Sequence, residues 1–175
     1  MYRLIVSLLF IAFISGCGPK KLTQEEIIKE KEAVESVALS YNKLVTAKNT
    51  EAILNLISNS SELLYIGTDS AEVFKNKDHI KSHLEVDWQL LDVSKVGDLR
   101  NVSILISTNG ELASMVYEIP WDMNFAGQQM HVIVRFAMAM TKESNEWHII
   151  QGLGQIATVG QSSEDLLAQM KKVKK

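Results

Sequence analysis

The second half of the chain alternates apolar and polar residues over long stretches, and this pattern most limits the possible folds. In "ELASMVYEIPWDM", residues 111–123, one set of alternate positions is apolar throughout: Ala113, Met115, Tyr117, Ile119 and Trp121. Such alternation is typical of a β-strand with one face against a core. The preceding Asn109-Gly110 pair favours a tight hairpin. Pro120 cannot donate a ladder hydrogen bond, so we expect an edge, a bend or a bulge there.

Three more segments have the composition of strands. They are "GDLRNVSILIS" at 97–107, "MHVIVRFAMAM" at 130–140 and "WHIIQGLGQI" at 147–156. Consecutive strands joined by short turns pair as antiparallel neighbours. This half of the chain therefore predicts a meander of about four long strands.

Helical patterns dominate the first half. A capping box at Thr23-Gln24-Glu25-Glu26 opens an apolar stripe that predicts a helix to about Lys48, and a shorter helix starts at Asn49 or Thr50. Two short strand-like runs, "ELLYIG" and "AEVF", precede a third helix in "NKDHIKSHLEVDWQLL". Helices followed by consecutive strands predict an α+β fold, in which a curved antiparallel sheet wraps around the N-terminal helices. A short helix is also predicted within the C-terminal tail, residues 159–175.

The N-terminus, "MYRLIVSLLFIAFISGC", combines one positive charge with a short apolar run. That run fits a secretory signal and is too short to span a bilayer as a helix. The last four residues, Ile14 to Cys17, resemble the lipobox of bacterial lipoproteins. The resemblance implies that residues 1–16 are a signal peptide and that Cys17 is acylated, with palmitate among the expected acyl chains. Residues 17–23 would then tether the domain to a membrane. An ordinary secreted protein with an incidental cysteine is the alternative.

Charge and cysteine content narrow the classes of partner and compartment. The net charge is −3 and the basic residues form no broad stripe, so nucleic acid is not an expected partner. A single cysteine excludes an intrachain disulfide framework. By the sorting rule known for lipoproteins, Gly18 after the cysteine favours the periplasmic side of the outer membrane, if the cell is Gram-negative.

The order of elements, together with "LYIGTDSAEVFKNKDHIKSHL" and "RFAMAMTKESNEWHII", resembles the SnoaL-like branch of the nuclear transport factor 2-like (cystatin-like) superfamily. The positions that carry the resemblance are Gly67, Glu72, Asn76-Lys77 and Trp147. It implies one SnoaL-like domain over residues 24–158, shaped as a cone with a cavity at its wide end. Members include isomerases, dehydratases, cyclases, assembly hubs and simple binding domains. By family habit, a homodimer is expected.

The resemblance also supplies candidate cavity residues. Many members carry a cavity-facing arginine where this chain has Arg135, whose guanidinium would bind a carboxylate or a similar anion. Gln151 and Leu153 stand where many members have His-x-His. The predicted ligand-binding set is Arg135, Gln151, Tyr65, Trp88, Tyr117 and Trp121. Strand alternation allows the alternative that Arg135 lies on the outer face of the sheet, and aromatic residues at these spacings often form plain core.

Other polar clusters give weaker signals. His79, His83 and Asp87 share one face of the third helix and could hold a metal, but nothing completes a metal motif, so no metal or cofactor is predicted. Glu118 and Asp122 lie roughly 13 Å apart along one strand, too far for a carboxylate dyad. No catalytic residue is assigned on these grounds.

The preferred interpretation is a cell-envelope lipoprotein whose domain acts as an interaction module or binds a small, partly apolar ligand, for which Arg135 would accommodate an anionic group. One alternative is an isomerase- or dehydratase-type enzyme that uses the cavity, which requires an acidic or histidine side chain facing it. A second alternative is a ligand-free protein-assembly module.

Overall fold

The computed structural model describes residues 21–158 and 161–173. Its first helix, α1 (Gln24–Thr46), starts with the predicted capping box. The Thr23 hydroxyl accepts a hydrogen bond from the Glu26 backbone N–H, and the Glu26 carboxylate accepts one from the Thr23 N–H. Both N–H groups lack a partner within the helix, so the box defines where it begins.

Two further helices and two short strands follow. α2 (Thr50–Leu56) is capped by the side chain of Asn49, and α3 (Lys77–Leu90) by the side chain of Asn76. Between them, β1 (Leu64–Ile66) and β2 (Val73–Phe74) form a small antiparallel pair. The helices and the two short strands therefore lie where the sequence places them.

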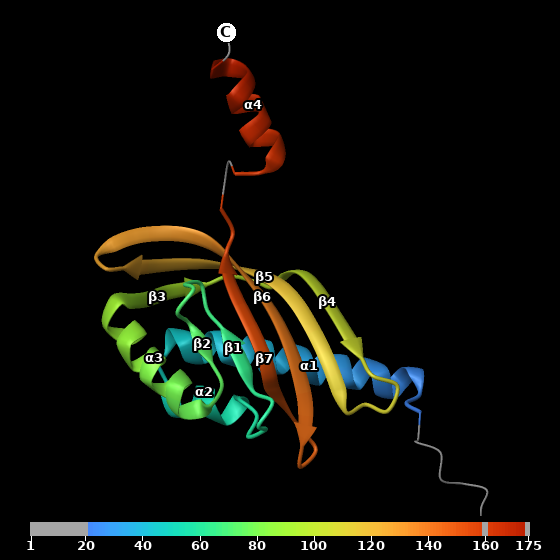
Figure 1. Ribbon diagram of the computed structural model, residues 1–175. Coiled ribbons are helices and arrows are strands. Elements are labelled where there is room, and N and C mark those ends of the chain that lie inside the picture. The colour runs from blue at the N-terminus through green and yellow to red at the C-terminus, as the bar shows by residue number, and fades with distance from the viewer. Residues whose placement is uncertain (1–20, 159–160, 174–175) are drawn as a thin grey trace, which may run out of the picture.

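The long strands form a curved sheet over the helices (Figure 1). They are β3 (Leu91–Val96), β4 (Arg100–Ile106), β5 (Leu112–Phe125), β6 (Gln128–Glu143) and β7 (Glu146–Ile156). The strand order is β2-β1-β7-β6-β5-β3, and β4 also pairs with β5. β1 runs parallel to β7, so the sheet is mixed. In this pairing it differs from the predicted antiparallel sheet. The α+β cone itself is confirmed.

Two strands, β4 and β3, pair one after the other with the same edge of β5. β4 pairs with its first half, up to Glu118, and β3 pairs with its second half, from Trp121. Pro120 lies at the junction, where its carbonyl accepts a hydrogen bond from Gly97 N–H at 2.8 Å. The missing proline N–H thus falls where one paired strand stops and the next starts.

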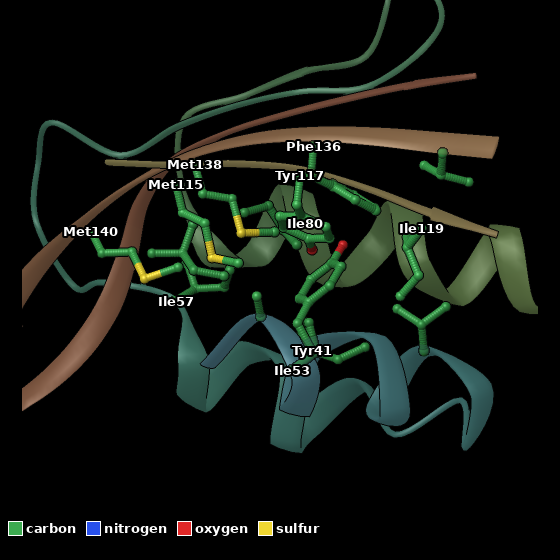
Figure 2. Packing of buried hydrophobic residues seen from close by; sticks show 14 of the residues in the cluster. Tyr41, Ile53, Ile57, Ile80, Met115, Tyr117, Ile119, Phe136, Met138 and Met140 are labelled. Atoms are coloured by element: carbon green, nitrogen blue, oxygen red, sulfur yellow. The ribbon is translucent and has the colours of Figure 1, made fainter. Parts of the chain in front are cut away.

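The concave face of the sheet and the inner faces of the helices enclose the core. All five alternate positions predicted to face inward on β5 are buried: Ala113, Met115, Tyr117, Ile119 and Trp121. Figure 2 shows Met115 of β5 beside Met138 and Met140 of β6, with Ile57 across from them. Each such side chain contributes roughly 1.5–3 kcal/mol through burial.

One polar side chain, Asn42 of α1, is 1% exposed within this core. Its amide nitrogen donates to the Tyr117 hydroxyl at 2.9 Å and to the Ala38 carbonyl at 2.8 Å. Its amide oxygen accepts a hydrogen bond from Trp121 Nε1 at 3.2 Å. Asn42 therefore fixes two aromatic side chains of β5 against α1, at no cost in unpaired buried groups.

β7 contains a bulge that changes which side chains face inward. Met140 pairs with Ile149, but the next residue on β6, Ala139, pairs with Gln151, so Ile150 is an extra residue. Up to Ile149 the odd-numbered positions face the core, and beyond the bulge the buried positions are the even-numbered Gly152 and Gly154. The bulge therefore inverts the two faces of the strand.

The last described element is α4 (Ser163–Val173), which stands apart from the sheet in Figure 1. Its large apolar side chains are exposed: Leu166, Leu167 and Met170. Within residues 21–158 and 161–173, no helix is both long enough and apolar enough to cross a bilayer. The predicted signal peptide and Cys17 lie outside the described residues.

Candidate functional site

A cavity of about 390 Å³ lies between the concave face of the sheet and the three helices. α1, α2 and α3 line it on one side, and β1, β2 and the inward faces of β3, β5, β6 and β7 on the other. Much of the wall is aromatic: Tyr41, Tyr65, Phe74, Trp88, Trp121, Phe125 and Phe136. An apolar, aromatic hollow with a few polar groups is the usual form of a small-molecule site.

A pair of tyrosine hydroxyls contributes polar atoms to this wall. The hydroxyls of Tyr41 and Tyr65 lie 2.9 Å apart. Burial raises the pKa of both phenols, so both stay protonated. Two hydroxyl protons and one bond between the oxygens leave one O–H that can donate to a ligand.

The ring of Tyr65 occupies space that only a glycine leaves open. A Cβ at Gly152 of β7 would lie 2.5 Å from two carbons of that ring. Gly152 faces inward because of the bulge in β7, and Tyr65 lies opposite it on the neighbouring strand β1. The bulge and the glycine together therefore set the position of a cavity side chain.

Two acidic side chains that line the cavity, Glu72 and Asp87, are partly exposed to solvent. Asp87 and His83, one turn apart on α3, form an ion pair with 3.2 Å between Oδ2 and Nε2, and their side chains are 31% and 23% exposed. The His83 ring stacks on Phe74 of β2, with 4.6 Å between ring centroids. Burial raises the pKa of Asp87, the charge of Glu72 raises it further, and that of His83 opposes the rise.

Glu72 belongs to the loop that joins β1 to β2. Its Oε2 accepts hydrogen bonds from the backbone N–H groups of Thr68 and Asp69, at 2.6 and 3.0 Å. The carboxylate folds over Gly67, where an added Cβ would lie 2.0 Å from the same oxygen. Glycine at this position therefore lets the loop hold the carboxylate beside the cavity.

Three of the six predicted ligand residues line the cavity: Tyr65, Trp88 and Trp121. The indole N–H of Trp88 donates to Thr50 Oγ1 at 2.8 Å, which fixes the ring between α3 and α2. Tyr117 does not line it. It is fully buried, its ring stacks on Phe136, and its hydroxyl accepts the Asn42 bond, so it belongs to the core.

The expectation that Arg135 points into the cavity is wrong. Arg135 lies on the outer face of β6, with 58% of its side chain exposed, and its Nε donates to Glu118 Oε1 at 2.7 Å. The two residues are direct cross-strand partners. Alternation decides the matter, because Val134 and Phe136 on either side of Arg135 line the cavity.

Gln151 is also placed wrongly by the prediction. Uninterrupted alternation from Trp147 and Ile149 points Gln151 inward, but the extra residue Ile150 turns it to the exposed outer face. There it borders a shallow groove together with Leu153 of the same strand. The first two inward positions beyond the bulge are glycines, Gly152 and Gly154, and the third, Ile156, lines the cavity together with Gly154.

The weaker polar candidates lie elsewhere or act differently. Asp122 lies on the outer face and pairs with His131 at 2.6 Å, as Glu118 pairs with its arginine. Within residues 21–158 and 161–173, no group of three His, Cys, Asp or Glu side chains could hold a metal. His83 and Asp87 instead contact each other and line the cavity.

The sequence did not identify four polar residues of the cavity as ligand-binding candidates: Tyr41, Glu72, His83 and Asp87. The four-residue spacing of the last two was a usable signal, since it puts them on one face of a helix. Nothing in the sequence shows that this face meets the cavity.

Comparison with known proteins agrees with this architecture. A family model described as the SnoaL-like domain matches residues 34–154. The chain belongs to the SnoaL-like domain family. Among curated protein sequences, no significant match was found.

Several solved structures are similar in fold to this SnoaL-like domain. A ketosteroid isomerase-like protein from Erwinia carotovora atroseptica has a TM-score of 0.63 at 10% identity, over 74% of this chain and 98% of its own. A candidate scytalone dehydratase from Novosphingobium aromaticivorans has a TM-score of 0.62 at 12% identity, over 75% and 86%. An NTF2-like protein of unknown function from Pseudomonas putida has a TM-score of 0.60 at 12% identity, over 77% and 90%. At these identities the likeness shows the fold alone.

Proposed function

We propose that this SnoaL-like domain binds a small, mainly apolar molecule in its cavity. The observation that carries the proposal is the cavity itself, about 390 Å³ of aromatic-lined space with the Tyr41–Tyr65 hydroxyl pair in its wall. Apolar surface favours binding, and a few polar groups select the ligand's orientation. A filled interior, as expected for an assembly module without a ligand, would lack such a space.

A cavity-filling variant tests binding before the ligand is known. Gly154 of β7 lines the cavity, and a Cβ there would lie 3.4 Å from the Phe136 ring, so Gly154→Leu adds its side chain to the hollow. Ala137→Leu on β6 is the matched control, since Ala137 faces the outer groove. Titration with the neutral dye Nile red should show one saturable site that Gly154→Leu weakens at least tenfold and the control leaves intact. Equal binding by both variants would place the dye outside the cavity.

A second candidate function is proton transfer on a bound carbonyl compound. The observation that favours it is Asp87, a partly buried carboxylate whose raised pKa suits a general base, with a tyrosine O–H in the same cavity to donate to an oxygen. Deuterium exchange next to the carbonyl of small cyclic ketones, followed by NMR, measures this activity directly. Asp87→Asn should abolish the exchange, while exchange at the buffer rate with the unmodified protein would leave only binding.

We further propose that Cys17 anchors the domain to the cell envelope, on the outer membrane if the cell is Gram-negative. The proposal rests on the lipobox-like residues before Cys17. Two or three acyl chains give the stable attachment that one chain does not. Metabolic labelling with an alkyne analogue of palmitate should label the protein in the membrane fraction. Cys17→Ala should abolish the label and release the protein from the membrane fraction. An unlabelled protein that stays with the membrane would refute acylation.

We also propose a homodimer through the outer face of the sheet. Leu105 of β4 and Val116 of β5 are 68% and 52% exposed on that face, close to the shallow groove bordered by Leu153. Leu105→Glu should convert a dimer to a monomer in light scattering after size exclusion. Leu167→Glu on α4 is the control, because it removes another exposed leucine away from this face. A monomeric unmodified protein would exclude the dimer.

A further inference from the structure

The charged groups of the cavity are acidic on balance. Glu72 and Asp87 supply carboxylates, and His83 is the one basic side chain among the lining residues. No lysine or arginine of the described chain lines the cavity. We propose that the cavity takes a ligand with an amine or ammonium head and an apolar body, which deepens the proposed binding function and rests on it.

Asp87 is the group best placed to meet such a head. It reaches the cavity from α3, and the His83 ring lies 3.2 Å from its carboxylate. Burial opposes its charged form. A cationic head beside Asp87 would stabilise the carboxylate, whereas an anionic head would add a third negative group.

Glu72, in the loop between β1 and β2, adds a second carboxylate that favours a cationic head in the cavity. Two backbone N–H groups of its loop hold one carboxylate oxygen, so the side chain stays in place without a basic partner. Glu72 and Asp87 line the same cavity, and the charge of Glu72 raises the pKa of Asp87. Two fixed acidic groups around a partly enclosed space favour a cation there.

The surrounding rings favour a cation as well. Trp88 lies next to Asp87 on α3, and Tyr65 comes from β1. The faces of such rings carry negative potential and attract ammonium groups, most of all where water is partly excluded. The rest of the hollow is apolar and suits the body of the ligand.

Two basic side chains outside the cavity, Arg135 and Lys48, have partners of their own. Arg135 lies on the outer face, paired with Glu118. The Lys48 ammonium lies 3.3 Å from the carbonyl oxygen of Trp88 and 3.4 Å from Asp92, and Lys48 does not line the cavity. The anionic ligand predicted from Arg135 therefore loses its basis.

The test compares three probes with the same body: 2-phenylethylamine, 2-phenylethanol and phenylacetate. Their affinities for the full chain are measured by calorimetry and by NMR shifts. We expect the amine to bind at least tenfold more tightly than the alcohol, and the carboxylate to bind most weakly. Asp87→Asn, alone and with Glu72→Gln, should remove the advantage of the amine and leave the affinity for the alcohol unchanged. Glu85→Gln is the matched control, because Glu85 is exposed on the same helix and does not line the cavity.

Several outcomes overturn the inference. Equal binding of amine and alcohol, or tighter binding of phenylacetate, refutes the charge preference while the cavity remains a binding site. An amine preference that survives both substitutions refutes the assignment to Asp87 and Glu72. Binding of Nile red without binding of any probe refutes this ligand class alone, and loss of Nile red binding as well refutes the proposed function beneath it.

Discussion

Replacing Asn42 with alanine tests whether one buried amide holds the wall of the cavity. The substitution removes three hydrogen bonds and leaves two groups of β5 without their partner, the Trp121 N–H and the Tyr117 hydroxyl oxygen. A buried polar group left unpaired costs roughly 1–3 kcal/mol. Two such groups predict a loss of roughly 2–6 kcal/mol, a large part of the 5–15 kcal/mol typical of a domain.

Urea unfolding followed by circular dichroism gives the free energy of unfolding. Asn55→Ala is the matched control: Asn55 is exposed on α2, so it reports the change in helix propensity alone. Asn42→Ala should also weaken Nile red binding, because Trp121 lines the cavity and loses the bond that orients it.

A double-mutant cycle separates the unpaired N–H from the other effects. Trp121→Phe removes the N–H itself, so it should cost at least about 1 kcal/mol less in the Asn42→Ala background than in the unmodified protein. Costs that add within about 0.5 kcal/mol, or an Asn42→Ala variant as stable as Asn55→Ala, would refute the reasoning.

Three further predictions follow from individual contacts. Gly152→Ala should destabilise the fold by roughly 1–3 kcal/mol and weaken Nile red binding, since its Cβ would lie 2.5 Å from the Tyr65 ring; an unchanged urea midpoint would contradict this packing. The Ser58 hydroxyl donates a hydrogen bond to Glu143 and lowers the pKa of that carboxyl below its ordinary 4.5. The ionised Glu143 therefore stabilises the fold above pH 4.5, and this stabilisation is lost as the pH falls through the lowered pKa. Glu143→Gln should therefore flatten the acid side of a stability profile taken between about pH 6 and pH 3, and an unchanged slope would contradict it. Arg135→Ala should change the free energy of unfolding by less than about 1 kcal/mol and leave Nile red binding unaltered, because the ion pair is exposed on the outer face; lost binding would contradict that placement.

The sequence predicts the order of elements well because local signals specify it. The capping box before Gln24, the turn at Asn109-Gly110 and the alternation along β5 each act over a few residues. The sequence does not indicate β3, because this strand continues directly from α3: Leu91 is both the C-cap of the helix and the first residue of the strand. No glycine or proline separates the two elements, so the change of backbone conformation leaves no mark in the sequence.

The cavity was harder to predict because it depends on which faces meet. Apolar alternation along β6 correctly indicates that Arg135 faces away from the core, and the resemblance to other members of the family favoured the opposite assignment. For His83 and Asp87, helical spacing shows that they share a face but not that this face borders a hollow. Only the packing of α3 against β2 supplies that information.

Because Ile150 is an extra, unpaired residue in β7, the side chains after it alternate out of step with those before it. If Ile150 were instead paired as a regular strand residue, Gln151, Leu153 and Gln155 would turn toward the helices, and the two glycines after the bulge would turn outward. Bulky side chains would then replace the bare backbone that leaves room for Tyr65. A slip of one residue in the pairing of β7 with β6 would therefore remodel one wall of the cavity, and counting positions by alternation along the sequence misassigns every side chain after the bulge.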